Sequence, residues 1–218
     1  MNYGFAHLDS IGKAVTGGTM GRQIVNLCCP GCGARVDTSQ NRCEWCNQPI
    51  VFTTFNDVYT MPASKVNRYA GAYQAALHES PESGTLNKSL GICYLKLHLY
   101  DKALAAFEHA LDDSASDSEV YFYAAVCLLR GKKAFLAQKK DITKIVEYIN
   151  AANAVEPRGI YYYFLAYVKY DYYARKQLNT RPGYEECLSK ATELKVSDYD
   201  LKLLFDILGI PKPAVFGG

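Results

Sequence analysis

The stretch that decides the fold is residues 90–110, LGICYLKLHLYDKALAAFEHA. Small and large apolar residues recur in it at helical spacing, with polar residues between them. The positions that set this pattern are Leu90, Gly91, Tyr94, Ala103, Phe107 and Ala110. Small residues on two facing helices let the backbones approach, and the aromatic rings fill the space beside them. The stretch therefore predicts two antiparallel helices.

The same pattern returns on both sides of this stretch. Ala76 precedes Ala110 by 34 positions, and Pro81 follows Ala76 by five. Later copies are longer, because Ala110 and Ala152 are 42 positions apart and Ala152 and Ala191 are 39 apart. The added residues fall between the two helices of each later copy. The chain is therefore expected to repeat one helical hairpin, with insertions in the second and third copies.

These residues and their spacing resemble the tetratricopeptide repeat (TPR) family, whose period is about 34 residues. The resemblance implies a mostly α fold, a TPR-like α-helical hairpin array (an α-solenoid), because one helix pair cannot bury its apolar face alone. Residues 65–78 resemble the second helix of a repeat whose first helix is missing. The later copies depart from the family where Ile145 and Tyr184 replace a small alanine.

Helix boundaries follow from capping residues and prolines. Pro81, Pro157 and Pro211 are expected to end helices, and Pro182 suits a first turn. The side chains expected to accept hydrogen bonds from free amides at helix starts are those of Asp101, Ser118, Asp141 and Ser197. The expected helices are 63–79, 85–98, 101–112, 118–131, 141–155, 158–175, 182–194 and 198–208.

A metal site is predicted before the helices. Cys29 and Cys32 are separated by two residues, as are Cys43 and Cys46, with ten residues between the pairs. Four thiolates at this spacing suit a tetrahedral zinc ion and leave no open position, so Zn2+ would be structural. The segment looks like a zinc ribbon over residues 27–55, closed by a strand at 50–55. An iron site with the same ligands and a redox dithiol pair stay open as alternatives.

Two other residues of the ribbon have expected roles. Trp45, the chain's one tryptophan, is expected to cover the site or to pack on residues 50–52, with partner contact as the less frequent alternative. Cys28 is the spare thiol, because its use would leave three residues between the first ligands.

Composition limits the function classes. The formal charge of +2 gives no general attraction to nucleic acid or membranes, and no apolar run approaches the ~20 residues that span a bilayer. The N-terminus lacks the apolar block of a signal peptide. The remaining cysteines, Cys93, Cys127 and Cys187, fall at apolar positions of predicted helices, so a reducing, cytoplasmic location is expected.

Aromatic and basic residues form the candidate partner-binding surfaces. Tyr163, Tyr167 and Tyr170 belong to a tyrosine-rich helix that could be core, an interface with a protein partner, or a base-stacking surface. The insertions carry Lys132, Lys133, Lys139 and Lys140. These lysines are either solvated charge or a basic rim for an acidic partner, nucleic acid or anionic lipid.

The lysine and asparagine clamp with which some TPR proteins hold acidic C-terminal peptides is absent, since Ile92 follows Gly91 where the family has asparagine. Catalysis is not expected, because the four histidines are scattered and no nucleophile has a base near it in the sequence.

The sequence thus predicts a flexible leader (1–26), a zinc ribbon (27–55), a TPR-like domain (63–210) and a mobile tail (211–218). The resemblance implies a non-enzymatic adaptor or scaffold that binds protein partners. One alternative is a nucleic-acid-associated factor that uses the ribbon and the lysine rim. The other is a structural subunit of a larger assembly, with the leader and the tyrosine face buried in it.

Overall fold

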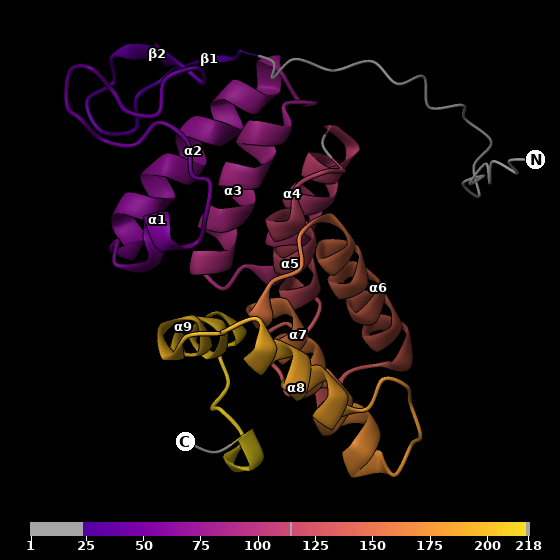
Figure 1. The fold of residues 1–218 in the computed structure, drawn as a ribbon. Helices are drawn as coiled ribbons and strands as arrows, with labels where there is room; N and C mark the ends of the chain where they lie inside the picture. Colours follow the sequence, from indigo (N-terminus) through magenta and orange to yellow (C-terminus); the bar gives the residue numbers. More distant parts are fainter. Residues whose placement is uncertain (1–23, 114, 217–218) are drawn as a thin grey trace, which may run out of the picture.

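The computed structural model describes residues 24–113 and 115–216, and most of the predicted leader lies outside these ranges. Successive helices stack side by side in chain order, with a small two-stranded sheet at the N-terminal end (Figure 1). The regular elements in the described ranges are β1 (Asn26–Cys28), β2 (Arg35–Asp37), α1 (Asn56–Tyr59), α2 (Ala63–Glu79), α3 (Gly84–Lys96), α4 (Tyr100–Asp113), α5 (Ser118–Cys127), α6 (Lys139–Val155), α7 (Gly159–Val168), α8 (Tyr184–Glu193) and α9 (Asp198–Leu208), with short 3-10 or π turns at η1 (Ala134–Leu136), η2 (Lys169–Tyr173), η3 (Ala174–Lys176) and η4 (Ala214–Phe216).

The helices form consecutive hairpins. α3 packs on α4, α5 on α6 and α7 on α8, and each hairpin also contacts the helix before it in the chain. The predicted fold class is therefore confirmed: a mostly α, TPR-like hairpin array with a small N-terminal β element. Among the helices that the structure describes, none is both long enough and apolar enough to cross a lipid bilayer.

The central hairpin shows why small residues are needed between helices. Phe107 of α4 is fully buried and its ring lies against Gly91 of α3, where a Cβ atom would come within 2.6 Å of the ring carbon Cε1. The ring of Tyr123 on α5 lies 5.6 Å from that of Phe107, centroid to centroid. The glycine thus lets one aromatic ring join three successive helices into one core.

Helix ends agree with the sequence-based bounds at α2 and α9 and differ elsewhere. The N-cap of α5 is Asp117, which accepts from the amides of Glu119 and Val120, so the predicted cap at Ser118 was wrong by one residue. The predicted helix 158–175 leaves α-helical geometry after Val168 and continues as the π turn η2. This wider turn buries the carboxylate of Asp171, which accepts from the amide of Phe135 at 2.8 Å.

The missing first helix of the α2 repeat is replaced by an extended segment. Residues 50–55, predicted as a strand, form none, because their backbone bonds to helix side chains instead. The hydroxyl of Ser89 accepts from the amide of Phe52 at 3.0 Å and donates to the carbonyl of Phe52 at 3.1 Å. The Tyr73 hydroxyl donates to the carbonyl of Ile50 at 2.8 Å. The Phe52 ring lies 4.6 Å from that of Tyr69.

The C-terminal helix folds back toward this segment. α9 contacts α5 and α7 (Figure 1), and it begins with a capping box between Ser197 and Asp200. The Tyr199 hydroxyl donates to Asn56 Oδ1 at 3.0 Å, and the Tyr59 hydroxyl donates to Asp206. These bonds tie α9 to the α1 region, although the bonded residues are 143 and 147 positions apart in the chain.

The predicted mobile tail also has a place in the described part of the fold. Phe216 is buried, and its ring lies 5.6 Å from that of Tyr163 and 5.4 Å from that of Tyr170. Phe216 therefore holds the end of this segment against the third hairpin.

Exchanging two glycines for alanine tests the packing of the central hairpin. We expect Gly91→Ala to lower the free energy of unfolding by about 1–3 kcal/mol, because the new methyl group would overlap the Phe107 ring. Gly71→Ala is the matched control: Gly71 lies in α2 with nothing within 4 Å of the added Cβ, so this change should stabilise by about 0.5–1 kcal/mol. Urea denaturation measures both, and equal effects would refute the close helix approach.

Removing one hydroxyl tests how the extended segment is held. Ser89→Ala leaves the buried amide and carbonyl of Phe52 without this partner, so we expect a loss of about 1–3 kcal/mol in unfolding free energy. Ser64→Ala, at an exposed position of α2, should change it by less than about 0.5 kcal/mol. A Ser89→Ala protein as stable as the control would contradict this anchoring.

Candidate functional site

The structure brings the four predicted metal ligands together. Cys29 and Cys32 lie in the turn between β1 and β2, and Cys43 and Cys46 lie in a second turn facing it. All four Sγ atoms lie within 4.8 Å of one another. The Cys29 and Cys46 sulfurs are 3.5 Å apart, and those of Cys32 and Cys43 are 3.7 Å apart. A tetrahedral zinc ion with bonds of about 2.3 Å needs sulfurs about 3.8 Å apart, so the residues fit this metal.

The two cysteine turns have the same backbone geometry. In the first, the Gly33 amide donates to the Cys29 carbonyl at 2.8 Å; in the second, the Asn47 amide donates to the Cys43 carbonyl at 2.8 Å. Gly33 and Asn47 hold the same position in their turns, and both have positive φ, at 78° and 55°. Glycine and asparagine tolerate this left-handed conformation best, so each turn has a residue suited to it.

The two cysteine turns lie so close together that only glycine fits at position 31. A Cβ atom there would lie 2.9 Å from Cys46 Sγ and 3.0 Å from Gln48 Cγ. The Gly31 amide also donates to Cys29 Sγ at 3.4 Å. A larger residue would push the second turn away from the first.

The electrostatics of the cluster favour a bound cation. For Cys43, burial favours the neutral thiol, but the amides of Cys46 and Trp45 favour the thiolate more, and the pKa of Cys43 falls to about 7. For Cys46, the Gln48 amide favours the thiolate, but burial and the neighbouring sulfurs prevail and the pKa rises to about 12. Four thiolates this close repel one another unless a cation lies between them.

Two ribbon residues lie outside the cluster. Cys28, the predicted spare thiol, is exposed, whereas the cysteines of α3, α5 and α8 are buried inside the array. Trp45 does not cover the site or pack on residues 50–52, because its side chain is 76% exposed. The turn geometry points its side chain outward between two ligands, so the expectation of a packed tryptophan was wrong.

The ribbon is joined firmly to the array. Lys65 of α2 donates to Gln48 Oε1 at 2.5 Å, and the Tyr69 hydroxyl donates to the carbonyl of Pro49 at 3.0 Å. Both acceptors directly follow the second cysteine turn. A metal that fixes this turn therefore also fixes the start of the extended segment that covers α2 and α3.

The predicted tyrosine face is mostly core. Tyr163 is 5% exposed and Tyr167 is 1% exposed; Tyr170 is half-buried against Tyr184 and Phe216. The Tyr167 hydroxyl accepts from the amide of Ala134 at 3.1 Å. These rings pack within the chain because the first insertion and the C-terminal residues cover them, so the burial of Tyr163 and Tyr167 agrees with the core alternative.

The predicted basic rim is exposed. Lys132, Lys133, Lys139 and Lys140 all lie at the surface, and within the described ranges none of them makes an ion pair. Figure 1 shows the first insertion, which joins α5 to α6, at the opposite end of the array from the cysteine turns. The ribbon and the lysines therefore do not form one continuous surface.

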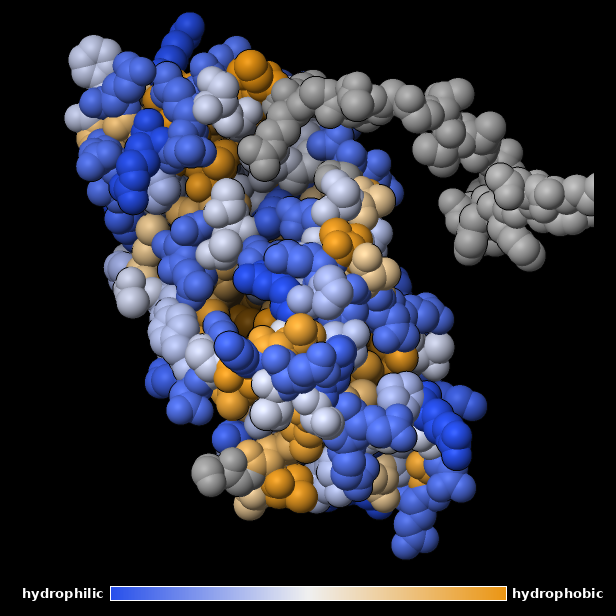
Figure 2. Space-filling view, in the orientation of Figure 1, coloured by the Kyte–Doolittle hydropathy of each residue, from blue (hydrophilic) through white to orange (hydrophobic). Residues whose placement is uncertain are grey.

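A small cavity was missed by the sequence analysis because four separate segments build it. It has a volume of about 70 Å3, and residues 54–56, α5, α7 and α9 line it. Its apolar wall includes Phe122, Leu204 and Ile207, and its polar wall includes Glu119 and Arg158. The face drawn in Figure 2 is hollowed near the positions that α1, α5 and α9 occupy in Figure 1.

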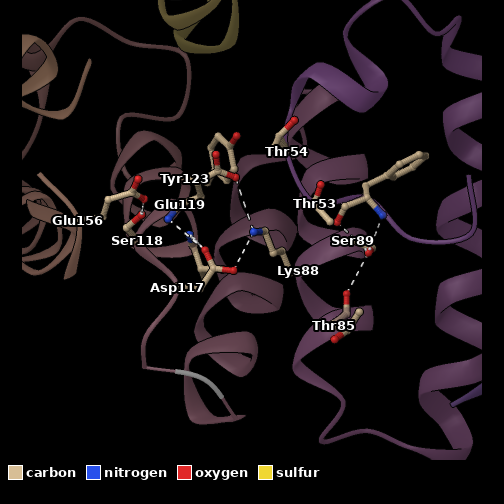
Figure 3. Close-up of polar contacts among 12 residues, drawn as sticks. Thr53, Thr54, Thr85, Lys88, Ser89, Asp117, Ser118, Glu119, Tyr123 and Glu156 are labelled. Carbon is tan, nitrogen blue, oxygen red and sulfur yellow. Dashed lines mark hydrogen bonds and ion pairs between the residues drawn. The ribbon is translucent and has the colours of Figure 1, made fainter. Parts of the chain in front are cut away.

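A series of ion pairs runs along the starts of α5 and α7 from α3 to this cavity. Lys88 of α3 lies 2.7 Å from Asp117 and 3.6 Å from Glu119, Nζ to carboxylate oxygen (Figure 3). The other oxygen of Glu119 lies 2.9 Å from Arg158 Nη1. The Arg158 guanidinium also donates to the hydroxyl of Tyr161 at 3.3 Å. The three hairpins are thus linked by one chain of alternating charges.

No family model matches the chain, and no curated protein matches it. Among solved structures, MamA from AMB-1 is similar, with 18% sequence identity, coverage of 68% of this chain and 84% of that chain, and a TM-score of 0.46. So distant a match implies nothing about activity. The helix pairs and the cysteine cluster themselves define a TPR-like helical protein with a four-cysteine site.

Replacing a ligand tests the metal site. We expect the protein to carry one structural metal ion and Cys43→Ser to lose it, because a hydroxyl is a poor ligand and three thiolates leave the site open. Cys28→Ser, which changes the exposed neighbouring thiol, should keep the metal. Elemental analysis measures this, and hydrogen exchange should rise over residues 25–48 in the Cys43→Ser protein while α3 to α8 stay protected. Metal retained equally by both variants would refute the four-cysteine site.

Proposed function

We propose that this chain is a non-enzymatic scaffold that binds a protein partner at the cavity between residues 54–56, α5, α7 and α9. The single observation that supports this is the cavity itself, whose apolar and polar walls meet on stacked hairpins. A volume of about 70 Å3 suits one inserted side chain or a few waters rather than a whole cofactor. The surrounding helices would then contact the rest of the partner segment.

The polar wall is suited to a peptide backbone. Glu119 and Arg158 are held by each other, so their orientation is fixed before a partner arrives. The Asn56 side chain accepts from Tyr199 at the rim. A peptide carries both donors and acceptors along its length, and this rim offers both kinds of group.

In this proposal the metal has an indirect role. Zn2+, the ion that four thiolates suit best, would hold the two cysteine turns together and supply no chemistry. Gln48 and Pro49 connect the second turn to α2, and the extended segment that follows carries Thr54 and Asn56 to the cavity. Loss of the metal would therefore loosen one wall of the partner site.

The two alternatives have less support. A nucleic acid held by both the ribbon and the lysine rim would have to reach both ends of the array (Figure 1). An assembly subunit held by its tyrosine face would need Tyr163 and Tyr167 to leave the core. The leader's part in such an assembly stays a prediction, since residues 1–23 lie outside the described ranges.

Site-specific photocrosslinking in cells tests the proposed scaffold. We expect a photoreactive residue at Leu203, which lines the cavity, to give discrete protein adducts. The control is the same residue at His109, an exposed position on α4. Arg158→Ala should weaken the Leu203 adducts at least severalfold, because it removes the cation of the polar wall and the ion pair that orients Glu119. Adducts of equal pattern and yield at both positions would refute a partner site at the cavity.

A further inference from the structure

The two insertions meet at one end of the array. The ring of Phe135, in the first insertion, lies under two cations of η3, the 3-10 turn that follows the π turn and begins the second insertion: Arg175 at 4.6 Å and Lys176 at 4.9 Å, measured to the ring centroid. Lys176 also lies 3.8 Å from the centroid of Tyr172. These contacts fix the first insertion beside the second, and Figure 1 shows both loops at the same corner, beyond the start of α6.

Positive charge exceeds negative charge at this corner. The described residues give no ion-pair partner to the four lysines of the first insertion or to Arg181 of the second. Of the acidic groups nearby, Asp171 is buried and paired with Arg175, and Asp141 is paired with Arg130, whereas Glu185 and Glu186 are exposed in the first turn of α8, after the second insertion. Glu147 is the acidic residue that shares a shallow groove with Lys139 and Lys140. A chain of formal charge +2 therefore presents one strongly basic corner.

Two apolar side chains stand among these cations. Leu136 is 68% exposed and lies between the first and second lysine pairs of the insertion. Leu178 is 47% exposed and follows Lys176 by two residues. Single exposed leucines are common. Here each of two adjoining basic loops exposes one leucine next to lysine or arginine side chains. Figure 2 shows mostly hydrophilic residues with isolated hydrophobic ones at this corner.

We propose that this corner, defined by Lys132, Lys133, Leu136, Lys139, Lys140 and Leu178, is a docking surface for an anionic lipid bilayer. Cations near a membrane are attracted by acidic headgroups, and exposed leucines gain by entering the boundary between headgroups and acyl chains. The two contributions need each other, because a basic patch or a single apolar tip alone binds only weakly and reversibly. The inference is independent of the cavity proposed for protein partners.

The same corner fits nucleic acid less well. Surfaces that bind single strands use free aromatic faces on which bases stack. Here Phe135 and Tyr172 are already covered by Arg175 and Lys176, and the exposed apolar side chains are leucines. Leucine offers no stacking surface, but it does partition into lipid.

Vesicle flotation with the full chain tests the proposal. We expect binding to phosphatidylcholine vesicles that contain about one-third phosphatidylserine to exceed binding to pure phosphatidylcholine by at least tenfold, and to fall as salt rises. Lys132→Glu with Lys133→Glu should reduce it by at least tenfold. The control, Arg68→Glu with Lys102→Glu, makes the same charge change at exposed positions on other helices and should keep most of the binding.

The leucines separate membrane docking from simple charge attraction. Leu136→Ser with Leu178→Ser should lower vesicle affinity severalfold at constant charge, whereas Leu99→Ser with Val155→Ser, at two other exposed apolar positions, should not. Equal affinity for neutral and anionic vesicles, or no effect of the leucine changes, would overturn the proposal. So would binding to duplex or single-stranded RNA in the absence of vesicle binding. All variants alter exposed side chains, and unchanged circular dichroism verifies their folding.

Discussion

The constraint on which the rest of the structure depends is that a stack of helical hairpins must cover its open apolar faces. α2 has no partner helix before it, and its buried residues include Tyr69 and Tyr73. The chain covers them with the extended segment after the ribbon, whose Phe52 ring lies against both tyrosines. Ser89 forms hydrogen bonds with both the amide and the carbonyl of Phe52, so these two backbone groups are paired without a neighbouring strand. Without this cover, the rings of Tyr69 and Tyr73 on α2 would be exposed.

This arrangement gives the cysteine turns a use beyond their own folding. So short a ribbon has little core of its own, and a metal ion would supply most of its stability. The turns end directly at Gln48 and Pro49, which are bonded to α2. The ion would thus fix one end of the covering segment while α9 holds the α1 region through Tyr59 and Tyr199. The cavity is therefore lined by the covering segment and α9 as well as by the repeat helices α5 and α7.

The insertions are the other departure from a regular array. In a regular repeat the turn between the two helices of a hairpin is short. Here the turns within the second and third hairpins are longer, and they contact each other. The π turn η2 places Asp171 inside, where it accepts from the amide of Phe135 and pairs with Arg175. A buried carboxylate with several donors can replace the missing backbone bonds of an irregular loop. As a result, the loops that present the cations and leucines of the two insertions are held in place by buried contacts.

The sequence by itself determined the repeat, the bounds of α2 and α9, and the four cysteines of the candidate site. These features depend on neighbours in the chain: helical spacing, caps, and two cysteines within one turn. Only the tertiary structure decided that Trp45 faces solvent, that Tyr163 and Tyr167 are core, and that residues 50–55 form no strand. The reason is that each of these depends on which distant segment comes to cover the residue. Ser89 bonds the extended segment, and Phe216 and α9 pack on the third hairpin. No local sequence pattern indicates these distant contacts.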